Sequence, residues 1–194
     1  MPPRDVPSGL APFRLRARVE RAAPGETFDA KLATPFAVLG IRTAGELVTG
    51  IEYLPKFVAT LSPKTKVAAE VCRQIEQYVD DPQFEFTLKF EYRGTLFQQK
   101  VWRAIYAIPC GQTLTYAAVA RQLKSAPRAV GGACGSNRLP LVIPCHRVVA
   151  SGGIGGFMHA SGGDPITIKQ WLLRHENAHE YAQKDTHKKS PGHA

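Results

Sequence analysis

The sequence predicts an α+β protein in which a small strand–helix–strand unit precedes a mostly helical unit with a helix-turn-helix. Three patterns indicate this order: two apolar runs joined by a short turn, one amphipathic helix followed by an alternating segment, and then a succession of capped helical segments. The 194 residues are enough to bury a core, as one large domain or two small ones.

Composition divides the chain into segments. Residues 1–26 are rich in Pro, Arg and small residues, and residues 179–194 are polar and basic, so we expect a flexible arm and a flexible tail. Between them we expect an α/β domain over residues 27–93 and a mostly helical domain over residues 94–178.

The amino-terminal domain is expected to contain two strands, a helix and a further strand. FAVLGIRT (36–43) and ELVTGIEYLP (46–55) have the composition of strands joined by an Ala-Gly turn. The helix that follows is predicted to start with Ser62 as N-cap and Pro63 at the first helical position, because apolar residues then recur every four positions. FEFTLKFEY (84–92) alternates apolar and polar residues, which predicts a half-buried strand.

Four helices are expected in the second domain. TLFQQKVWRAIYAI (95–108) has an apolar face, and Pro and Gly follow it. Thr115 is the expected N-cap of the next helix, Pro127 starts a third, and Asp164 with Pro165 begins the last. The two short helices that start near Thr115 and Pro127 are joined by a tight turn, which is the outline of a helix-turn-helix.

The second helix of this pair is unusual for a helix that reads DNA. PRAVGGACGSN (127–137) offers mostly Ala and Gly, with Arg128 and Asn137 as its long polar residues. A helix that reads the major groove usually carries several polar side chains, whereas a smooth face allows close approach to a backbone or a narrow groove. A glycine-rich helix packed tightly on its neighbour fits the same residues, so both interpretations stay open.

Charge and cysteine usage restrict the class of protein. The formal net charge is +9, which makes nucleic acid or another acidic surface a plausible partner. The chain has neither the apolar core of a signal peptide nor a run of about 18 apolar residues, so no membrane association is expected. The cysteines lack CxxC spacing, which favours reduced thiols in the cytoplasm over disulfides or a metal site. They are Cys72, Cys110, Cys134 and Cys145.

A thiol, an imidazole and a guanidinium stand at consecutive positions in LPLVIPCHRVVAS (139–151), behind an apolar run. IPCHRVV (143–149), preceded by RAVGGACGSN (128–137) and followed by GGIGGF and KQWLLRHE (169–176), closely resembles the O6-alkylguanine-DNA alkyltransferases. These proteins are also called methylated-DNA–protein-cysteine methyltransferases. The resemblance is dense over residues 95–177 and looser before them.

The resemblance implies DNA repair by irreversible transfer of an alkyl group, such as methyl, from O6 of guanine to the protein's own cysteine. It implies action on double-stranded DNA with base flipping, activity toward O4-alkylthymine, and a ribonuclease H-like amino-terminal domain. It also assigns DNA binding and the active site to residues 94–178. No cofactor-binding motif is present and the thioether product is stable, so we expect a monomer that acts once, without cofactor or obligate protein partner.

The resemblance assigns chemical roles to particular residues. Cys145 is the alkyl acceptor, because a thiolate suits attack on saturated carbon. His146 takes the thiol proton through a bridging water, and Glu176 orients the imidazole, which has the logic of a catalytic triad. Asn137 would tie the helix-turn-helix to the active-site loop, and Arg147 would anchor that loop by pairing with a carboxylate.

The same resemblance assigns residues to DNA binding. Arg128 would enter the base stack through the minor groove and replace the flipped base. Tyr116 would push the neighbouring phosphate and donate a hydrogen bond to the guanine, while Ala129 and Gly131 belong to the helix that faces DNA. A phosphate contact for Arg128 and a core position for Tyr116 are the alternatives.

The substrate pocket is expected to be lined by Tyr116, Val148, Phe157 and Ser161. GGIGGFMHASGGDPITIK has Phe157 where the family commonly has tyrosine, and several extra residues precede Ser161, which matches the family residue that hydrogen-bonds O6. His159 in this insertion is expected at the surface.

Other function classes fit parts of the sequence. A cysteine hydrolase would use Cys145 with His146, although a hydrolase base normally comes from a separate element. A non-catalytic binder of alkylated bases would lack the acceptor cysteine, which is present. A transcriptional regulator would need an additional metal-binding domain, for which the chain lacks the cysteines.

Overall fold

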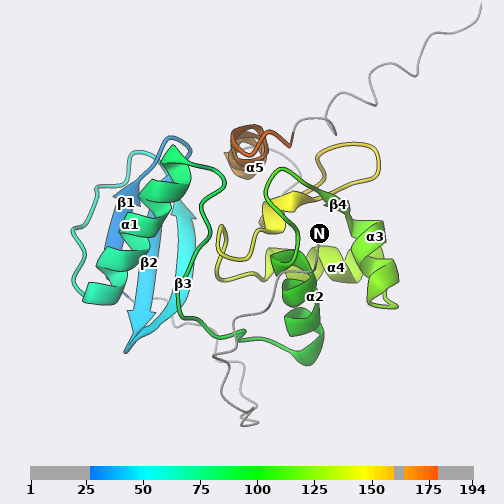
Figure 1. Cartoon of the computed structure of the whole chain (residues 1–194), viewed down its shortest axis with the longest axis horizontal. Coiled ribbons are helices and arrows are strands. Elements are labelled where there is room, and N and C mark those ends of the chain that lie inside the picture. Colours follow the sequence, from blue (N-terminus) through cyan, green and yellow to red (C-terminus); the bar gives the residue numbers. More distant parts are fainter. Residues whose placement is uncertain (1–26, 160–163, 179–194) are drawn as a thin grey trace, which may run out of the picture.

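The computed structural model describes residues 27–159 and 164–178 and shows a mixed α/β fold. The predictions for the arm (1–26), the tail (179–194) and Ser161 lie outside these residues. In Figure 1 a small sheet with one helix lies beside a group of further helices. Within the described part of the chain, no helix has the length and apolar character needed to cross a membrane.

The amino-terminal sheet has three antiparallel strands in the order β1 (Ala30–Ala33), β2 (Val38–Ala44) and β3 (Leu47–Leu54). The predicted hairpin is β2–β3, and its turn places Gly45 at φ +57°, a conformation that glycine adopts without strain. The short strand β1 was not predicted. Helix α1 (Lys66–Asp80) packs on the sheet.

The prediction that α1 starts at Ser62 and Pro63 is wrong. Leu61 exchanges two backbone hydrogen bonds with Lys31, at 2.9 and 3.0 Å, which hold the chain extended at this point. The helix begins only after Thr65, whose side chain caps it.

The segment 84–92 is extended, but the prediction of a regular strand is wrong. Its side chains alternate between half-buried and exposed, as expected. Its backbone, however, forms an isolated bridge between Phe90 and Val48 instead of a continuous ladder. A side chain binds the segment at Thr87, where Gln74 of α1 accepts from Thr87 N and donates to Thr87 Oγ1, both at 2.9 Å. A single backbone hydrogen bond joins Val48 to Lys89 of the segment.

The second unit contains the four expected helices. They are α2 (Leu96–Tyr106), α3 (Tyr116–Gln122), α4 (Pro127–Gly135) and α5 (Asp164–His175). Thr95 forms a capping box with Gln98, and Thr115 caps α3 as predicted. Asp164 is the first residue of α5 rather than its cap.

Three short elements that were not predicted organise the region around Cys145. The 3₁₀ turn η1 (Cys145–Arg147) carries the Cys-His-Arg motif, and β5 (Val148–Val149) follows it directly. Strand β5 pairs in parallel with β4 (Leu114–Thr115), which leads into α3. The start of α3 is therefore fixed next to the cysteine.

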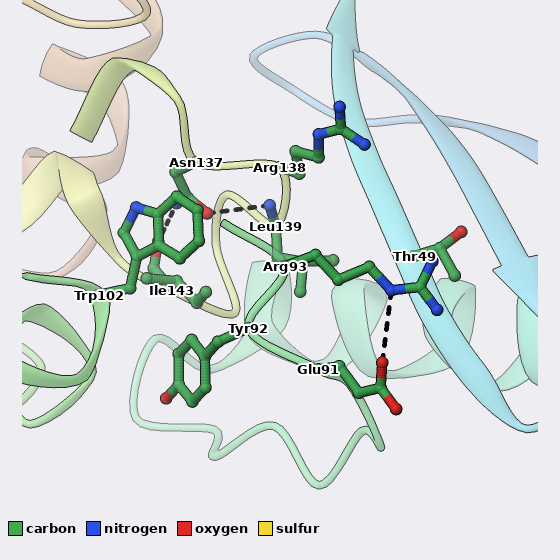
Figure 2. Close-up of a pocket in the computed structure, with 9 residues that line it drawn as sticks. All are labelled: Thr49, Glu91, Tyr92, Arg93, Trp102, Asn137, Arg138, Leu139 and Ile143. Atoms are coloured by element: carbon green, nitrogen blue, oxygen red, sulfur yellow. Dashed lines mark hydrogen bonds and ion pairs between the residues drawn. The ribbon is translucent and has the colours of Figure 1, made fainter. Parts of the chain in front are cut away.

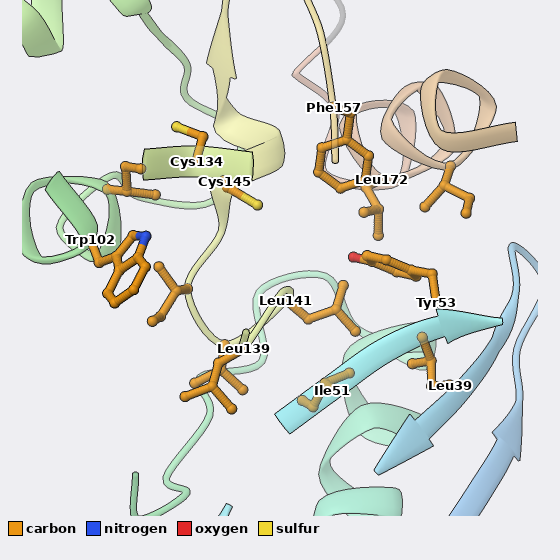
Figure 3. Close-up of a cluster of buried hydrophobic side chains, with 14 of the residues drawn as sticks. Leu39, Ile51, Tyr53, Trp102, Cys134, Leu139, Leu141, Cys145, Phe157 and Leu172 are labelled. Carbon is orange, nitrogen blue, oxygen red and sulfur yellow. The ribbon is translucent and has the colours of Figure 1, made fainter. Parts of the chain in front are cut away.

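One hydrophobic cluster extends through both units. It joins residues of the sheet and α1 to residues of α2, α4, α5 and the loop before η1. Figure 3 shows part of it, with Tyr53 of β3, Leu141 of the loop and Leu172 of α5 directed toward a common centre. The backbone of Ile51 also donates to Arg138 O at 2.8 Å, so the sheet packs against the segment that leads to the cysteine.

Candidate active site

Cys145 lies at the start of η1 and is only 5% exposed. The apolar residues before it are buried and fix the loop in the core. Asn137, just after α4, donates from Nδ2 to Ile143 O at 2.8 Å and to Cys145 Sγ at 3.4 Å. Its Oδ1 accepts from Leu139 N at 2.9 Å. Asn137 thus connects the end of α4 with the loop and with the sulfur itself.

His146 and Glu176 form a buried pair. Nε2 of His146 lies 2.8 Å from Oε1 of Glu176, and both side chains are almost fully buried. The hydrogen bonds from His146 and Arg147 and the positive charge of Arg147 lower the pKa of the Glu176 carboxyl despite its burial, so it is an anion that only accepts hydrogen bonds. Nε2 of His146 must therefore carry the proton, which leaves Nδ1 with a lone pair. Among the described residues, buried Nδ1 has no hydrogen-bond partner.

Two further donors hold the Glu176 carboxylate. Arg147 donates from Nε to Oε2 at 2.8 Å and from Nη2 to Oε1 at 2.9 Å, a bidentate pair, and its Nη1 donates to Ile108 O at 2.6 Å. Tyr78 of α1 donates to Oε1 at 2.8 Å. Glu176 is thus the common acceptor of three side chains that come from both units.

Burial and polar contacts have opposite effects on the Cys145 thiol. Burial raises its pKa, because a thiolate is poorly solvated there, whereas the Asn137 hydrogen bond and the positive charge of Lys169 act to lower it. Burial also lowers the pKa of His146, which keeps the imidazole neutral at rest. The site therefore combines a thiol with a neutral base whose free nitrogen is Nδ1.

Lys169 of α5 is a buried cation that the sequence analysis did not single out. Its side chain is fully buried, and Nζ donates to Val148 O at 2.7 Å and to Gly156 O at 3.0 Å. Burial lowers its pKa to about 8, which still leaves it mainly charged at pH 7. A sequence signal was present: Lys169, Leu172 and Glu176 lie on one helical face, so the lysine falls on the buried stripe.

Tyr116, at the start of α3, lies between α4 and the loop that follows β5. Its hydroxyl donates to Gly156 O at 2.9 Å. The ring is so close to Gly155 that a Cβ there would lie 3.0 Å from it, and a Cβ at Gly131 would lie 3.9 Å from it. The small residues on both sides therefore make room for this ring.

Of the other predicted pocket residues, Val148 and Phe157 are buried, and Phe157 packs on Tyr53 with ring centroids 5.8 Å apart. His159 is exposed, as expected, and its ring lies against Gly135 at the end of α4, where an added Cβ would be 2.6 Å from Nε2. The loop is therefore in contact with α4.

Helix α4 has one buried and one exposed side. Val130, Ala133 and Cys134 are buried, whereas Arg128 and Ala129 in its first turn are exposed. Figure 2 shows the side chains that line a small pocket, among them Asn137, Arg93 and Arg138. Its volume of about 10 Å³ is too small for a nucleobase. In the described residues, no group of three or more His, Cys, Asp or Glu could hold a metal ion.

Comparison with known proteins gives consistent matches. Residues 96–178 match the family described as "6-O-methylguanine DNA methyltransferase, DNA binding domain". A methylated-DNA–protein-cysteine methyltransferase of Salmonella typhimurium is 47% identical over 93 residues, which are 46% of this chain and 52% of that protein. One of Archaeoglobus fulgidus is 32% identical over 131 residues, or 67% of this chain and 89% of that protein. The matched region thus spans about half of the Salmonella relative and most of the archaeal one.

Solved structures show the same similarity. The crystal structure of Mycobacterium tuberculosis O6-methylguanine methyltransferase matches with a TM-score of 0.65 and 30% identity, covering 80% of this chain and 94% of that one. The structure of the Mycobacterium tuberculosis protein in complex with DNA matches with a TM-score of 0.64 and 31% identity, covering 80% and 95%.

Proposed function

Because this chain belongs to the O6-methylguanine DNA methyltransferase family, we propose that it repairs DNA by moving the alkyl group from O6 of guanine to Cys145 Sγ. The observation that carries this proposal is the arrangement of Cys145 beside His146, whose buried Nδ1 is free to take a proton while Nε2 is held by Glu176. This is an acceptor with a base and an orienting carboxylate.

The reaction follows from these groups. Cys145 loses its proton to Nδ1 of His146 through a water molecule, and Glu176 stabilises the imidazolium that forms. The thiolate attacks the alkyl carbon, the sulfur–carbon bond forms, and the carbon–O6 bond breaks. The electron pair leaves with guanine, which takes up the proton from His146. Asn137 and Lys169 supply the hydrogen bond and positive charge that favour the thiolate.

Transfer should occur once per molecule. A thioether is not cleaved by any group described around Cys145, so the alkylated protein does not return to its starting state. No cofactor is required for this step, because the alkyl group passes directly from guanine O6 to the cysteine sulfur. We assign the same chemistry to O4-alkylthymine, and we assign a monomeric state to the active protein.

The target base must leave the duplex to reach a sulfur that is only 5% exposed. We place DNA on α3 and α4, which act as a helix-turn-helix whose exposed Arg128 enters the base stack. Ala129 and Gly131 allow close approach of the helix to the DNA backbone. The net charge of +9 favours this partner, and a relative's structure in complex with DNA supports it.

The flipped base would enter beside Tyr116, Val148 and Phe157. The resemblance adds Ser161, which lies outside the described residues. Because the Tyr116 hydroxyl already donates to Gly156 O, its hydrogen bond to guanine requires the loop to release it. We assign a supporting role to the ribonuclease H-like domain over residues 27–93, which packs against the part of the chain that carries the site.

The test is the intact mass of the protein after mixing with a short duplex that carries one O6-methylguanine. We expect a gain of one methyl group per molecule, with a burst amplitude equal to the protein concentration. A second duplex with O4-methylthymine tests the wider substrate range. Sustained turnover of a peptide or ester substrate without modification of the protein would instead indicate a hydrolase.

Replacing Lys169 by methionine tests the electrostatic part of the mechanism. We expect the apparent pKa of the Cys145 thiol to rise, because the variant removes a buried positive charge near the thiolate. The measurement is the pH dependence of Cys145 alkylation by iodoacetamide. Lys100→Met, on the exposed side of α2, is the control and should leave this pKa unchanged. If the pKa of the Cys145 thiol is unchanged in Lys169→Met, the lysine serves only to hold the loop through its hydrogen bonds.

A further inference from the structure

The hydroxyl of Tyr53 is buried and lacks a partner among the described residues. Tyr53 belongs to β3, is 8% exposed, and packs its ring on Phe36 and Phe157, with centroids 6.1 and 5.8 Å away. A buried hydroxyl without a hydrogen bond is costly and uncommon. The rings around it fix the orientation of this group, so it needs a polar partner at a defined place.

This hydroxyl faces the reactive centre. Figure 3 shows it directed away from β3 and toward the segment that carries Cys145. Burial raises the pKa of this hydroxyl, and electrostatic interactions with Cys145 and then with the Glu176 carboxyl raise it further. Nδ1 of His146, which is adjacent to Cys145 in the chain, is a second buried atom that lacks a partner in the described part of the chain.

The chemistry of these groups fits one shared water molecule. A phenol donates a hydrogen bond, a thiol donates weakly, and Nδ1 in the tautomer imposed by Glu176 only accepts. One water can accept from the Tyr53 hydroxyl and from the thiol while it donates to Nδ1. This gives the water the three partners that a buried water typically has and satisfies both unpartnered atoms.

We propose that Tyr53 is a positioning residue that holds the water through which Cys145 passes its proton to His146. The proposal rests on the proposed function and adds a role for the amino-terminal domain in the chemistry. The thiol gives its proton to the water oxygen, and the water gives one of its own protons to Nδ1. Tyr53 keeps its proton throughout and fixes the water by donating to it.

Titratable and charged groups from several elements surround this relay. Tyr53 faces Cys145, Glu176 and Tyr78, and His146 faces Glu176, Arg147 and Lys169. Cys145 also faces Lys169 of α5, Cys134 of α4 and Tyr116 of α3. Glu176 is paired and stays ionised. Lys169, whose pKa burial lowers to about 8, also titrates between about pH 6 and 9, but it does so in wild type and in a Tyr53 variant alike. A comparison of the two proteins therefore reports on the thiol and the imidazole that the relay connects.

Tyr53→Phe tests the proposal, because it removes one hydroxyl and keeps the packed ring. The readout is the rate of methyl transfer from an O6-methylguanine duplex across this pH range. We expect a loss of about tenfold near pH 7 that becomes smaller as pH rises, since a thiol deprotonated by solvent no longer needs the relay. A purely structural role would lower the rate equally at every pH.

Two further variants make the outcome decisive. Thr113→Val removes another buried hydroxyl that has no partner in the described residues, and it should leave the pH profile unchanged. In a His146→Gln background, Tyr53→Phe should have no additional effect, because the relay has lost its acceptor. Superimposable pH profiles of wild type and Tyr53→Phe would overturn the proposal. If the wild-type protein takes up no methyl group, the proposed function itself fails.

Discussion

A Cys145→Ser variant is expected to bind an alkylated duplex and to take up no alkyl group. A serine hydroxyl is a far weaker nucleophile than a thiolate toward saturated carbon, so the rate should fall by at least about a thousandfold. The substitution changes one buried atom and keeps the hydrogen bond from Asn137 available to the new side chain. The intact mass after incubation with the O6-methylguanine duplex measures transfer, and a gel-shift titration measures binding.

Cys134→Ser is the matched control for this prediction. Cys134 lies on α4, is 9% exposed, and is close enough for its thiol to interact electrostatically with Cys145. Burial and Cys145 raise the pKa of this thiol, and the described hydrogen bonds give it no equivalent of the Asn137 contact. It should therefore remain a thiol, and its variant should keep transfer of one methyl group per molecule. If Cys145→Ser still takes up a methyl group, and this uptake disappears when Cys134 is also replaced, then Cys134 rather than Cys145 is the acceptor.

The parts of the fold that depend on neighbours in sequence could be predicted. The starts of α2, α3 and α4 follow from Thr95, Thr115 and Pro127, which act within their own first turn. The hairpin β2–β3 follows from alternation and a short turn. In each case the residues that decide the structure are within a few positions of one another.

The parts that depend on distant partners could not be predicted. Alternation in 84–92 indicated correctly which side chains are half-buried, but the segment meets β3 only in an isolated bridge at Val48, and Gln74 of α1 binds it at Thr87. Ser62 does not cap the helix as expected, because its neighbour Leu61 pairs with Lys31, thirty positions earlier in the chain, and this pairing keeps the backbone extended. A local pattern states a preference, and a long-range hydrogen bond decides whether it is realised.

The residues of the candidate site also fall into two groups, those that the sequence could predict and those that it could not. The residues that resemble a family motif, Cys145 and His146, could be selected from the sequence, and the structure places Glu176 and Asn137 against them. Tyr78 could not be selected, because it lies 98 positions before Glu176 in the chain and no sequence pattern predicts a contact between them. The same holds for Tyr53, which also reaches the site from the amino-terminal unit.

Replacing Glu176 by glutamine is expected to reduce stability more than any surface substitution. Its carboxylate accepts from His146, Arg147 and Tyr78 in the interior, and an amide would leave the Arg147 guanidinium without a balancing charge. Removing one partner of a buried ion pair typically costs about 3–5 kcal/mol. We expect a loss of this size in the free energy of unfolding at pH 7, measured by urea denaturation. Glu52→Gln, which breaks an exposed pair with Arg42, should cost less than about 1 kcal/mol.

The pH dependence of this loss separates the charge from the shape of the side chain. The folded state lowers the pKa of Glu176, because the hydrogen bonds from His146 and Arg147 and the positive charge of Arg147 favour the carboxylate, while the unfolded chain keeps the ordinary value of about 4.3. The unfolded state therefore binds the proton more readily, so the stability that Glu176 contributes is complete above that value and declines as pH falls below it. The variant has no such titration. The difference in unfolding free energy between wild type and Glu176→Gln should thus be largest at neutral pH and shrink below about pH 4, whereas a difference that is constant with pH would show that packing, rather than the buried carboxylate, is responsible.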